Sequence, residues 1–319
     1  FKEVVGTEVK VLSAPLAKDK RERKDASWVS AKIESFGNQQ VWEVALRRRN
    51  ETKIISATQK HRWIAREQTR RSFRIVETDE LREGMLLASL LPRSNLKNSK
   101  PSPTGIIQGL VYGDGHLATS GGSAITLWGA KNLELLPLFA GHPSSETITP
   151  NRVPGIAIRG LPGFYKTKLP DLEVVIPYLY GWLAGYLAAD GSVSSEGVVK
   201  LDSVNRANLE FVQALALRLG IATNPIHKHL NKNSFRKGGH TLFTLTFVKA
   251  SITEDLLLLQ EHKRRFVEAN SKRVTAGWHV ESVRATNKEA EVFCAIVPEN
   301  GTFALADYIW VGNCERYRL

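Results

Sequence analysis

Sulfur is scarce in this sequence of 319 residues, which contains two Cys and one Met. Two cysteines cannot form a disulfide framework, so we expect a reducing, cytoplasmic setting in which thiols stay reduced. No apolar run approaches the roughly 18 residues that suggest a membrane-spanning helix. The opening residues FKEVVGTEVK also lack the apolar stretch of a signal peptide. These absences argue against a secreted, disulfide-stabilised protein and against association with a membrane.

Acidic residues are also fewer than basic residues. The sequence has 44 Lys and Arg against 32 Asp and Glu, which gives a net charge of +12. Such an excess favours a polyanionic partner, of which nucleic acid is the commonest. A merely basic soluble protein remains the alternative on charge alone.

The chain changes character twice along its length. Short alternating runs such as WVSAKIESF, QQVWEVALRR and TKIISATQ predict β-strands over residues 1–94. The polar stretch NLKNSKPSPT predicts a linker, after which the apolar segments GIIQGLVYGDG and PYLYGWLAGYLAADG predict helices, each stopped by a left-handed Gly. The β pattern returns near Trp278. We therefore predict a multidomain chain in which a β domain, residues 1–94 and 273–313, is interrupted by an α/β domain over 95–272.

The two predicted helices repeat one pattern, IQGLVYGDG at 107–115 and LAGYLAADG at 183–191. Gly109 and Gly113 share a helix face, as do Gly185 and Ala189, because residues four apart are neighbours on a helix. Such small residues allow two helix backbones to approach closely. The pattern also places one carboxylate at each helix C-terminus.

These carboxylates belong to Asp114 and Asp190. A carboxylate there is penalised by about 0.3–1 kcal/mol, because the helix C-terminus carries partial negative charge. Two matched penalties suggest a shared compensating cation, and oxygen ligands favour Mg²⁺. Metal ions next to a phosphodiester would support its hydrolysis. The alternative is a pair of core helices whose Asp side chains only cap or hydrogen-bond.

The repeated segments resemble the motif of the LAGLIDADG homing endonucleases, and LAGYLAADG is nearly the family signature. The resemblance implies a monomer with two αββαββα halves, with the motif helices packed at the centre. It also implies a long double-stranded DNA target, cleaved with Mg²⁺ held by Asp114 and Asp190. The run IHKHLNKNSFRKGGH is basic, although it could be an ordinary solvated loop. Our predicted DNA-binding residues are Lys228, Lys232, Arg236, Lys237, Lys249 and Lys131.

Both cysteines lie in the last part of the chain, and Cys314 directly follows Asn313. An Asn side-chain amide can attack its own backbone carbonyl and cut the chain after itself. A neighbouring thiol can hold an acyl group as a thioester. Together these reactions would release one chain and ligate another, which is protein splicing.

The chain resembles an intein over nearly its whole length. VFCAIVPENGTFALADYIWVGNC is similar to the last two intein blocks, and ATQKHRW supplies the T-x-x-H signature as Thr58 and His61. The resemblance implies a horseshoe-like Hint splicing domain, and residues 314–319 would begin the downstream host segment. The residues that the resemblance makes catalytic are Thr58, His61, Trp63, Cys294, Asn313 and Cys314.

The chain departs from most inteins at its start, where Phe1 replaces the usual nucleophile. Together with Cys294 and Trp63, this departure resembles the class 3 inteins, in which an internal Cys attacks the upstream junction. Val311 lacks the Thr typical of that class. Removal or replacement of the first residue, with Cys294 an inert core thiol, is the alternative. Gly312 stands where a His usually assists Asn cyclisation, so a water or His279 could help instead.

We therefore predict a self-splicing intein with an inserted DNA endonuclease. Splicing would act on the flanking host segments in cis and need no cofactor. Two alternatives remain at this point. The insert could bind DNA without cleaving it, or the β domain could cleave without ligating.

Overall fold

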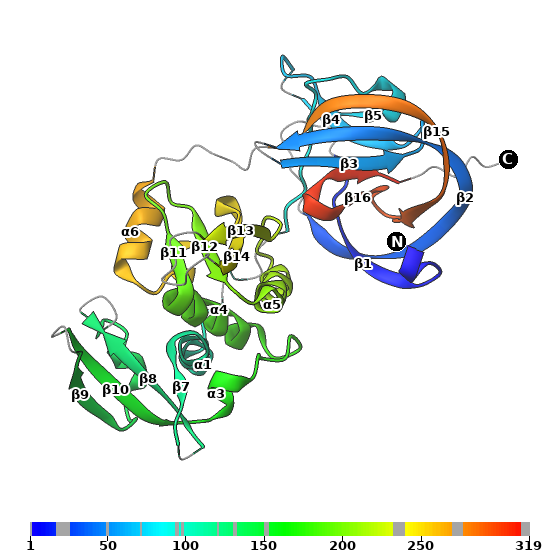
Figure 1. The fold of residues 1–319 in the computed structure, drawn as a ribbon. Coiled ribbons are helices and arrows are strands. Elements are labelled where there is room, and N and C mark those ends of the chain that lie inside the picture. Colours follow the sequence, from blue (N-terminus) through cyan, green and yellow to red (C-terminus); the bar gives the residue numbers. More distant parts are fainter. Residues whose placement is uncertain are drawn as a thin grey trace. The chain divides into compact units, whose positions relative to one another are not determined.

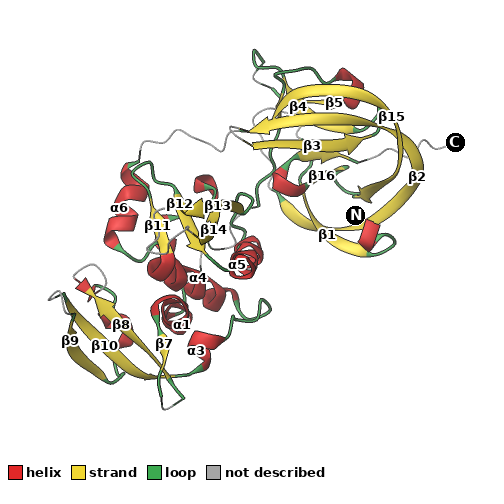
Figure 2. Ribbon diagram, viewed as in Figure 1, coloured by secondary structure: helices red, strands yellow, loops and turns green. Residues whose placement is uncertain are grey.

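The computed structural model describes residues 2–16, 26–48, 51–70, 72–92, 96, 99–119, 121–129, 133–149, 153–231, 240–269 and 277–313. The chain divides into two compact units (Figure 1). Unit 1 comprises Phe1–Arg93 and Thr275–Leu319, and unit 2 comprises Ser94–Val274. Strands predominate in unit 1, whereas unit 2 mixes strands and helices (Figure 2). Lys131, Lys232, Arg236, Lys237 and Cys314 lie outside the described residues.

Unit 1 is an antiparallel sheet whose strands follow the order β1-β2-β15-β6-β4-β17-β16, with β3 paired to β2 and β5 to β4. Its strands are β1 Glu8–Ser13, β2 Ser27–Arg48, β3 Glu51–Ala57, β4 Arg62–Arg66, β5 Arg74–Glu77, β6 Leu86–Leu87, β15 His279–Ile296, β16 Thr302–Ala304 and β17 Trp310–Gly312. Its 3-10 turns are η1 Lys2–Val4, η2 Thr78–Glu80 and η6 Ala306–Tyr308.

The long strands β2 and β15 pair along most of their length and curve around unit 1 (Figure 1). The sequence predicted two strands where β2 runs unbroken, because Gly37 takes the left-handed φ of 73° and the strand continues through it. The first and last strands of this order, β1 and β16, are joined by side-chain hydrogen bonds. The Ser13 hydroxyl donates to the Thr302 carbonyl at 2.7 Å, and the Thr302 hydroxyl donates to the Ala14 carbonyl at 2.5 Å. The sheet is thereby nearly closed, and its buried side chains form one large apolar cluster and a smaller one near the joined strands.

Unit 2 contains two four-stranded antiparallel sheets, ordered β7-β8-β10-β9 and β11-β12-β14-β13. The first half consists of α1 Pro103–Asp114, β7 His116–Leu117, β8 Ser123–Trp128, η3 Leu136–Phe139, β9 Ser144–Ile148, β10 Pro154–Leu161 and α3 Phe164–Thr167. The second half consists of α4 Ile176–Asp190, β11 Gly191–Val193, β12 Val199–Ser203, α5 Arg206–Arg218, β13 His227–Asn231, β14 His240–Thr246, η4 Lys249–Ser251, η5 Glu254–Leu256 and α6 Gln260–Glu268.

Both sheets have their strands in the order first, second, fourth, third, so the two halves repeat one topology. The second half has the αββαββα order. In the described part of the first half, the short turn η3 stands between β8 and β9 where the second half has α5. Among the described residues, no helix is both long and apolar enough to cross a membrane.

The glycines that end α1 and α4 differ from the left-handed stops that the sequence predicted. Gly115 has φ −78° and Gly191 has φ −81°, both extended. They are required for space instead. A Cβ on Gly115 would lie 2.5 Å from the Val111 carbonyl oxygen, and one on Gly191 would lie 2.3 Å from that of Leu187. Glycine thus lets the chain turn from each helix directly into a strand.

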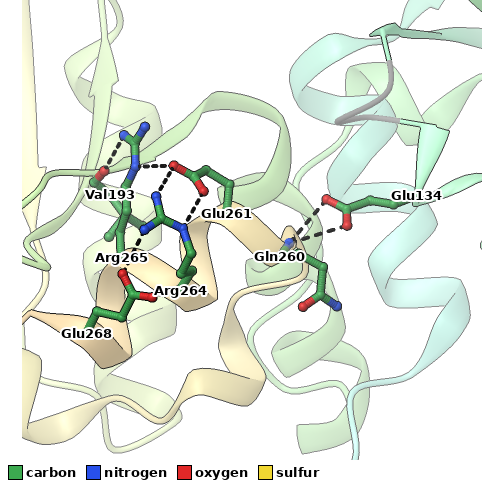
Figure 3. A network of polar contacts seen from close by, with 7 residues as sticks. All are labelled: Glu134, Val193, Gln260, Glu261, Arg264, Arg265 and Glu268. Carbon is green, nitrogen blue, oxygen red and sulfur yellow. Dashed lines mark hydrogen bonds and ion pairs between the residues drawn. The ribbon is translucent and has the colours of Figure 1, made fainter.

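Helix α6 makes polar contacts with the first half of unit 2 and with β11 of its own half (Figure 3). The Gln260 amide at its N-terminus donates to the Glu134 carboxylate of the first half, at 3.1 and 3.4 Å to the two oxygens. A carboxylate there also complements the helix dipole. Arg265 donates to the Val193 carbonyl of β11 at 3.1 Å and to Glu261 at 2.8 Å.

Candidate functional site

The helices α1 and α4 pack backbone to backbone, as the small-residue spacing predicts. A Cβ on Gly109 would lie 2.1 Å from the Trp182 carbonyl oxygen, and one on Gly185 would lie 2.1 Å from that of Ile106. No real Cβ contact is that short, so only glycine permits this approach. The aromatic rings of Tyr112 and Trp182 lie 5.4 Å apart across the pair.

Asp114 and Asp190 are the last residues of these two helices, and the helix ends converge. A Cβ on Gly113 of α1 would lie 3.3 Å from Asp190 Oδ2 of α4. Both aspartates keep exposed surface. Desolvation by the surrounding atoms nevertheless raises the pKa of each, and the charge of Asp114 raises the pKa of Asp190 further. The two carboxylates are therefore close enough to repel each other.

Lys166 on α3 is a cation at this site that the sequence analysis missed. Its ammonium donates to the carbonyls of Tyr112 at 2.7 Å and Gly113 at 2.9 Å, in the last turn of α1. A cation there complements the negative end of the helix dipole. Burial lowers the pKa of Lys166, whereas Asp190 and Asp114 raise it. The ammonium thus provides part of the compensation that the carboxylates need.

Two tyrosines complete the site. The Tyr186 hydroxyl is hydrogen-bonded to the Asp190 carboxylate, which lowers the pKa of Asp190 and partly offsets its desolvation. Burial, followed by the charge of Asp190, raises the pKa of Tyr186 itself, so its hydroxyl keeps the proton and donates it. The Tyr112 hydroxyl donates to Asn208 Oδ1 at 3.1 Å. The bond from Tyr186 restricts the directions in which the carboxylate of Asp190 can point.

The donor set fits a hard divalent cation that is shared with a substrate. Asp114 and Asp190 supply carboxylate oxygens, and their repulsion would be relieved by bound positive charge. Within the described ranges, no group of three or more His, Cys, Asp and Glu gathers at one place. Mg²⁺ commonly binds through one or two carboxylates, several waters and substrate phosphates. Two aspartates therefore suffice for an ion bound jointly with a phosphodiester.

Two of the predicted DNA-binding residues are described. Lys228 is exposed on β13, opposite Phe243 of β14. Lys249 has a structural role that the sequence did not predict. Its ammonium donates to the Phe266 carbonyl at 2.7 Å and the Ala269 carbonyl at 3.1 Å, where α6 ends. In this structure Lys249 stabilises the end of α6, and Lys166 takes the position beside the aspartates.

In unit 1, Thr58 and His61 lie in the turn between β3 and β4. The His61 amide donates to the Thr58 carbonyl at 3.1 Å. Both residues line a pocket of about 630 Å³, together with Arg62 and, from β15, Phe293. The T-x-x-H pattern thus occupies the wall of a cavity large enough to admit a peptide segment.

Trp63 is completely buried behind this turn. Its ring meets that of His61 edge to face, with the centroids 4.9 Å apart. Its Nε1 donates to the Thr78 hydroxyl at 3.0 Å, and this hydroxyl donates to the His61 carbonyl at 3.4 Å. Trp63 therefore fixes the position of His61 from inside the core.

Cys294 lies in β15 with 1% of its surface exposed. It belongs to the same buried cluster as Trp63, and its Sγ lies 3.6 Å from the Ala295 carbonyl oxygen. The neighbouring Phe293 lines the pocket. Successive side chains of a strand point to opposite faces, so Cys294 points away from the pocket. The thiol therefore faces the core behind the pocket wall.

Asn313 ends the described chain and is held on several sides. Its Nδ2 donates to the Val297 carbonyl at 3.0 Å, and its Oδ1 accepts from the Val297 amide at 3.3 Å. Its own amide donates to the Gly301 carbonyl at 2.8 Å. Its carbonyl accepts from Arg62, which the sequence analysis also missed. The proposed helper His279 begins β15, at the opposite end from Val297, where it pairs with Leu86 and Arg47.

Comparisons with known proteins identify one part of the chain. A model of the LAGLIDADG-like domain family matches residues 177–269, from α4 to the end of α6. Among solved structures, the chain is similar to full-length DUF199/WhiA from Thermatoga maritima, with 14% identity, a TM-score of 0.35, and coverage of 55% of this chain and 61% of that one. It is also similar to the homing endonuclease I-DmoI in complex with DNA and Ca, with 16% identity, a TM-score of 0.32, and coverage of 50% and 94%. No curated protein matches the chain. The second half of unit 2 is thus a LAGLIDADG-like domain, to which α4 contributes the motif helix and Asp190.

Proposed function

We propose that unit 2 is a homing endonuclease that binds a long double-stranded DNA site and hydrolyses its phosphodiester bonds. The observation that carries this proposal is the convergence of Asp114 and Asp190 at the ends of two closely packed helices. Helices that approach so closely present two matched carboxylates at one place. The match to the LAGLIDADG-like domain family over residues 177–269 supports the same function.

Asp114 and Asp190 would hold Mg²⁺, which when bound supplies an activated water and stabilises the leaving oxygen. The chain's own residues prepare the site. The Tyr186 hydroxyl orients Asp190, and Lys166 holds the last turn of α1 in place while its charge balances the carboxylates. Lys228 is exposed on β13, where it can contact phosphates.

The test is cleavage of a randomised duplex DNA library in Mg²⁺, with the cut ends sequenced. The wild type should enrich one long site, and Asp114→Asn and Asp190→Asn should abolish cutting while retaining binding. Asp171→Asn, at an exposed loop carboxylate of the same unit, serves as the matched control. Binding by the wild type without cutting would support the alternative of a DNA-binding insert. Undiminished cutting by both motif variants would exclude the proposed site.

We further propose that unit 1 is a Hint splicing domain, which makes the chain a self-splicing intein. The arrangement of Thr58 and His61 on the wall of the 630 Å³ pocket supports this proposal, since the pocket can admit the upstream junction. The shared cluster of Trp63 and Cys294 supports the internal nucleophile. The several contacts to Asn313 support the downstream reaction.

The reaction would proceed in four steps without a cofactor. The Cys294 thiol attacks the upstream junction carbonyl, and His61 donates a proton to the departing amine. The acyl group then passes from Cys294 to Cys314. Asn313 cyclises and releases the intein, and the remaining thioester rearranges to a peptide bond. Because Cys294 is almost fully buried, its thiol reaches the junction only when the residues covering it move. This burial predicts a slow first step.

The test is intact-mass spectrometry of the chain expressed between two foreign flanks. Ligated flanks together with the excised chain would support splicing. Hydrolysed flanks without a ligated product would support the alternative of cleavage without ligation, and an unchanged precursor would exclude both. The proposal also includes a monomeric, cytoplasmic protein whose flanking host segments react in cis.

A further inference from the structure

The backbone carbonyl of Asn313 is the group that is attacked when this residue cyclises. Its oxygen accepts two hydrogen bonds from the guanidinium of Arg62. Arg62 Nε donates to this carbonyl oxygen at 2.8 Å and Arg62 Nη2 donates to it at 2.5 Å. The two residues are 251 positions apart in the sequence and meet because β17 pairs with β4, where Val311 lies opposite Trp63. Arg62 itself is half-buried. The guanidinium therefore points at a reacting atom from a partly desolvated position.

The side chain of Asn313 is positioned independently of Arg62. Its amide group exchanges two hydrogen bonds with the backbone of Val297, and its backbone amide is bonded to the Gly301 carbonyl. The nucleophile and the attacked carbonyl thus belong to one residue that is held from two directions. Arg62 acts on the carbonyl, and Val297 acts on the amide.

Gly312 provides the space that the guanidinium occupies. A Cβ at this position would lie 2.9 Å from Arg62 Cβ and 3.1 Å from Arg62 Nε. Gly312 has no left-handed backbone angle, so conformational freedom does not explain the glycine. Any larger residue at 312, including a His, would compete with Arg62 for this space.

We propose that Arg62 is the catalytic oxyanion donor for cyclisation of Asn313, and that Gly312 is its required partner. The proposal rests on the proposed splicing function. Asn313 Nδ2 attacks the Asn313 carbonyl carbon, and a C–N bond forms while the oxygen gains negative charge. Arg62 stabilises this oxygen with two charge-assisted hydrogen bonds. The peptide bond to Cys314 then breaks, and the proton lost by Nδ2 reaches the departing amine through solvent. The products are a C-terminal succinimide and a free amine on Cys314, so atoms and charge balance.

The experiment measures cleavage at Asn313 by intact mass, with the full chain between foreign flanks. We expect Arg62→Ala to slow succinimide formation by about 10²–10³-fold, as for the loss of an oxyanion donor. Arg62→Lys keeps the positive charge but loses the paired N–H donors of the guanidinium, so its rate should lie between those of Arg62→Ala and the wild type. Methylguanidinium added to Arg62→Ala should restore part of the rate, which a merely structural role would not allow. Gly312→Ala should slow the same step, because the added Cβ displaces Arg62.

Two controls separate the possible failures. Upstream cleavage by an added thiol should proceed in Arg62→Ala combined with Asn313→Ala, which shows that unit 1 still folds. If the wild type never cleaves at Asn313, the splicing proposal itself fails, and this inference fails with it. If the wild type cleaves and both Arg62→Ala and Arg62→Lys match its rate, splicing stands and the role of Arg62 is refuted. If Arg62→Ala does not fold, the rate of Arg62→Lys decides.

Discussion

Gly185→Ala is an informative substitution because Gly185, like Gly109, lies where the backbones of α1 and α4 approach most closely. Its Cβ would lie 2.1 Å from the Ile106 carbonyl oxygen and 2.9 Å from the Leu110 nitrogen, whereas ordinary contacts begin at 3.4 Å. The obstacles are backbone atoms of α1, so no side-chain rotation can relieve the clash. Helices α1 and α4 must separate by roughly 1 Å, the shortfall between 2.1 and 3.4 Å.

Two opposing effects set the magnitude of the change. Replacing Gly by Ala inside a helix stabilises it by about 1 kcal/mol. Overpacking a dense interface costs about 1–3 kcal/mol, occasionally more, and we place this rigid contact at the upper end. We expect a net loss of about 2 kcal/mol in the free energy of unfolding of unit 2. For a domain of this size, the loss lowers Tm by about 4–8 °C.

Differential scanning calorimetry of the full chain measures this shift. Thr104→Ala, at an exposed position of α1, introduces the same residue without a clash and should leave the transition nearly unchanged. The transition of unit 1 provides an internal reference. An unchanged or raised Tm of unit 2 in Gly185→Ala would refute the backbone-to-backbone packing of the motif helices.

Three further predictions concern the two sites. The folded-state pKa of Asp190 is raised above its unfolded value, so its charge destabilises unit 2 at neutral pH. Asp190→Asn should therefore raise the Tm of unit 2 at pH 7. This rise in Tm should vanish as the pH falls below the unfolded-state pKa of Asp190, where the carboxyl is protonated in both states. A rise in Tm that persists at that low pH would contradict the desolvated charge as its cause. Lys166→Met should lower Tm at pH 7, because it leaves the charges of both aspartates uncompensated. Added Mg²⁺ should raise the Tm of this variant more than that of the wild type. Equal responses to Mg²⁺ would argue against a cation site at the two aspartates. Trp63→Phe removes the hydrogen bond to Thr78 and should lower the free energy of unfolding of unit 1 by about 1–3 kcal/mol in chemical denaturation. This loss should be smaller when Thr78→Val is also present. Strictly additive losses would contradict the coupling of the two residues.

Features that depend on local spacing could be predicted from the sequence. The positions of Gly109 and Gly185 predicted the close approach of two helices, because residues four apart share a helix face. The position of each motif aspartate at the end of its helix followed from the glycine that comes directly after it. Strand patterns predicted the β-rich segments of unit 1, although not that two of them join through Gly37 into one long strand.

Features that depend on contacts between distant segments could not be predicted. Lys166 reaches the end of α1 only because α3 packs there, and no local pattern distinguishes it from Lys249, which bonds to the end of α6 instead. Arg62 meets Asn313 through the pairing of β4 with β17. Whether Cys294 faces the pocket or the core depends on the register of β15, and a shift of one residue would reverse it.

The splicing mechanism is tested most directly by one comparison. The chain is expressed between two foreign flanks as the wild type and as Cys294→Ala, and the products are identified by intact-mass spectrometry. We predict that the wild type yields ligated flanks, whereas Cys294→Ala loses upstream cleavage and keeps the downstream cleavage that depends on Asn313. Normal splicing by Cys294→Ala would contradict the account, because Cys294 would then be only a buried thiol of the core.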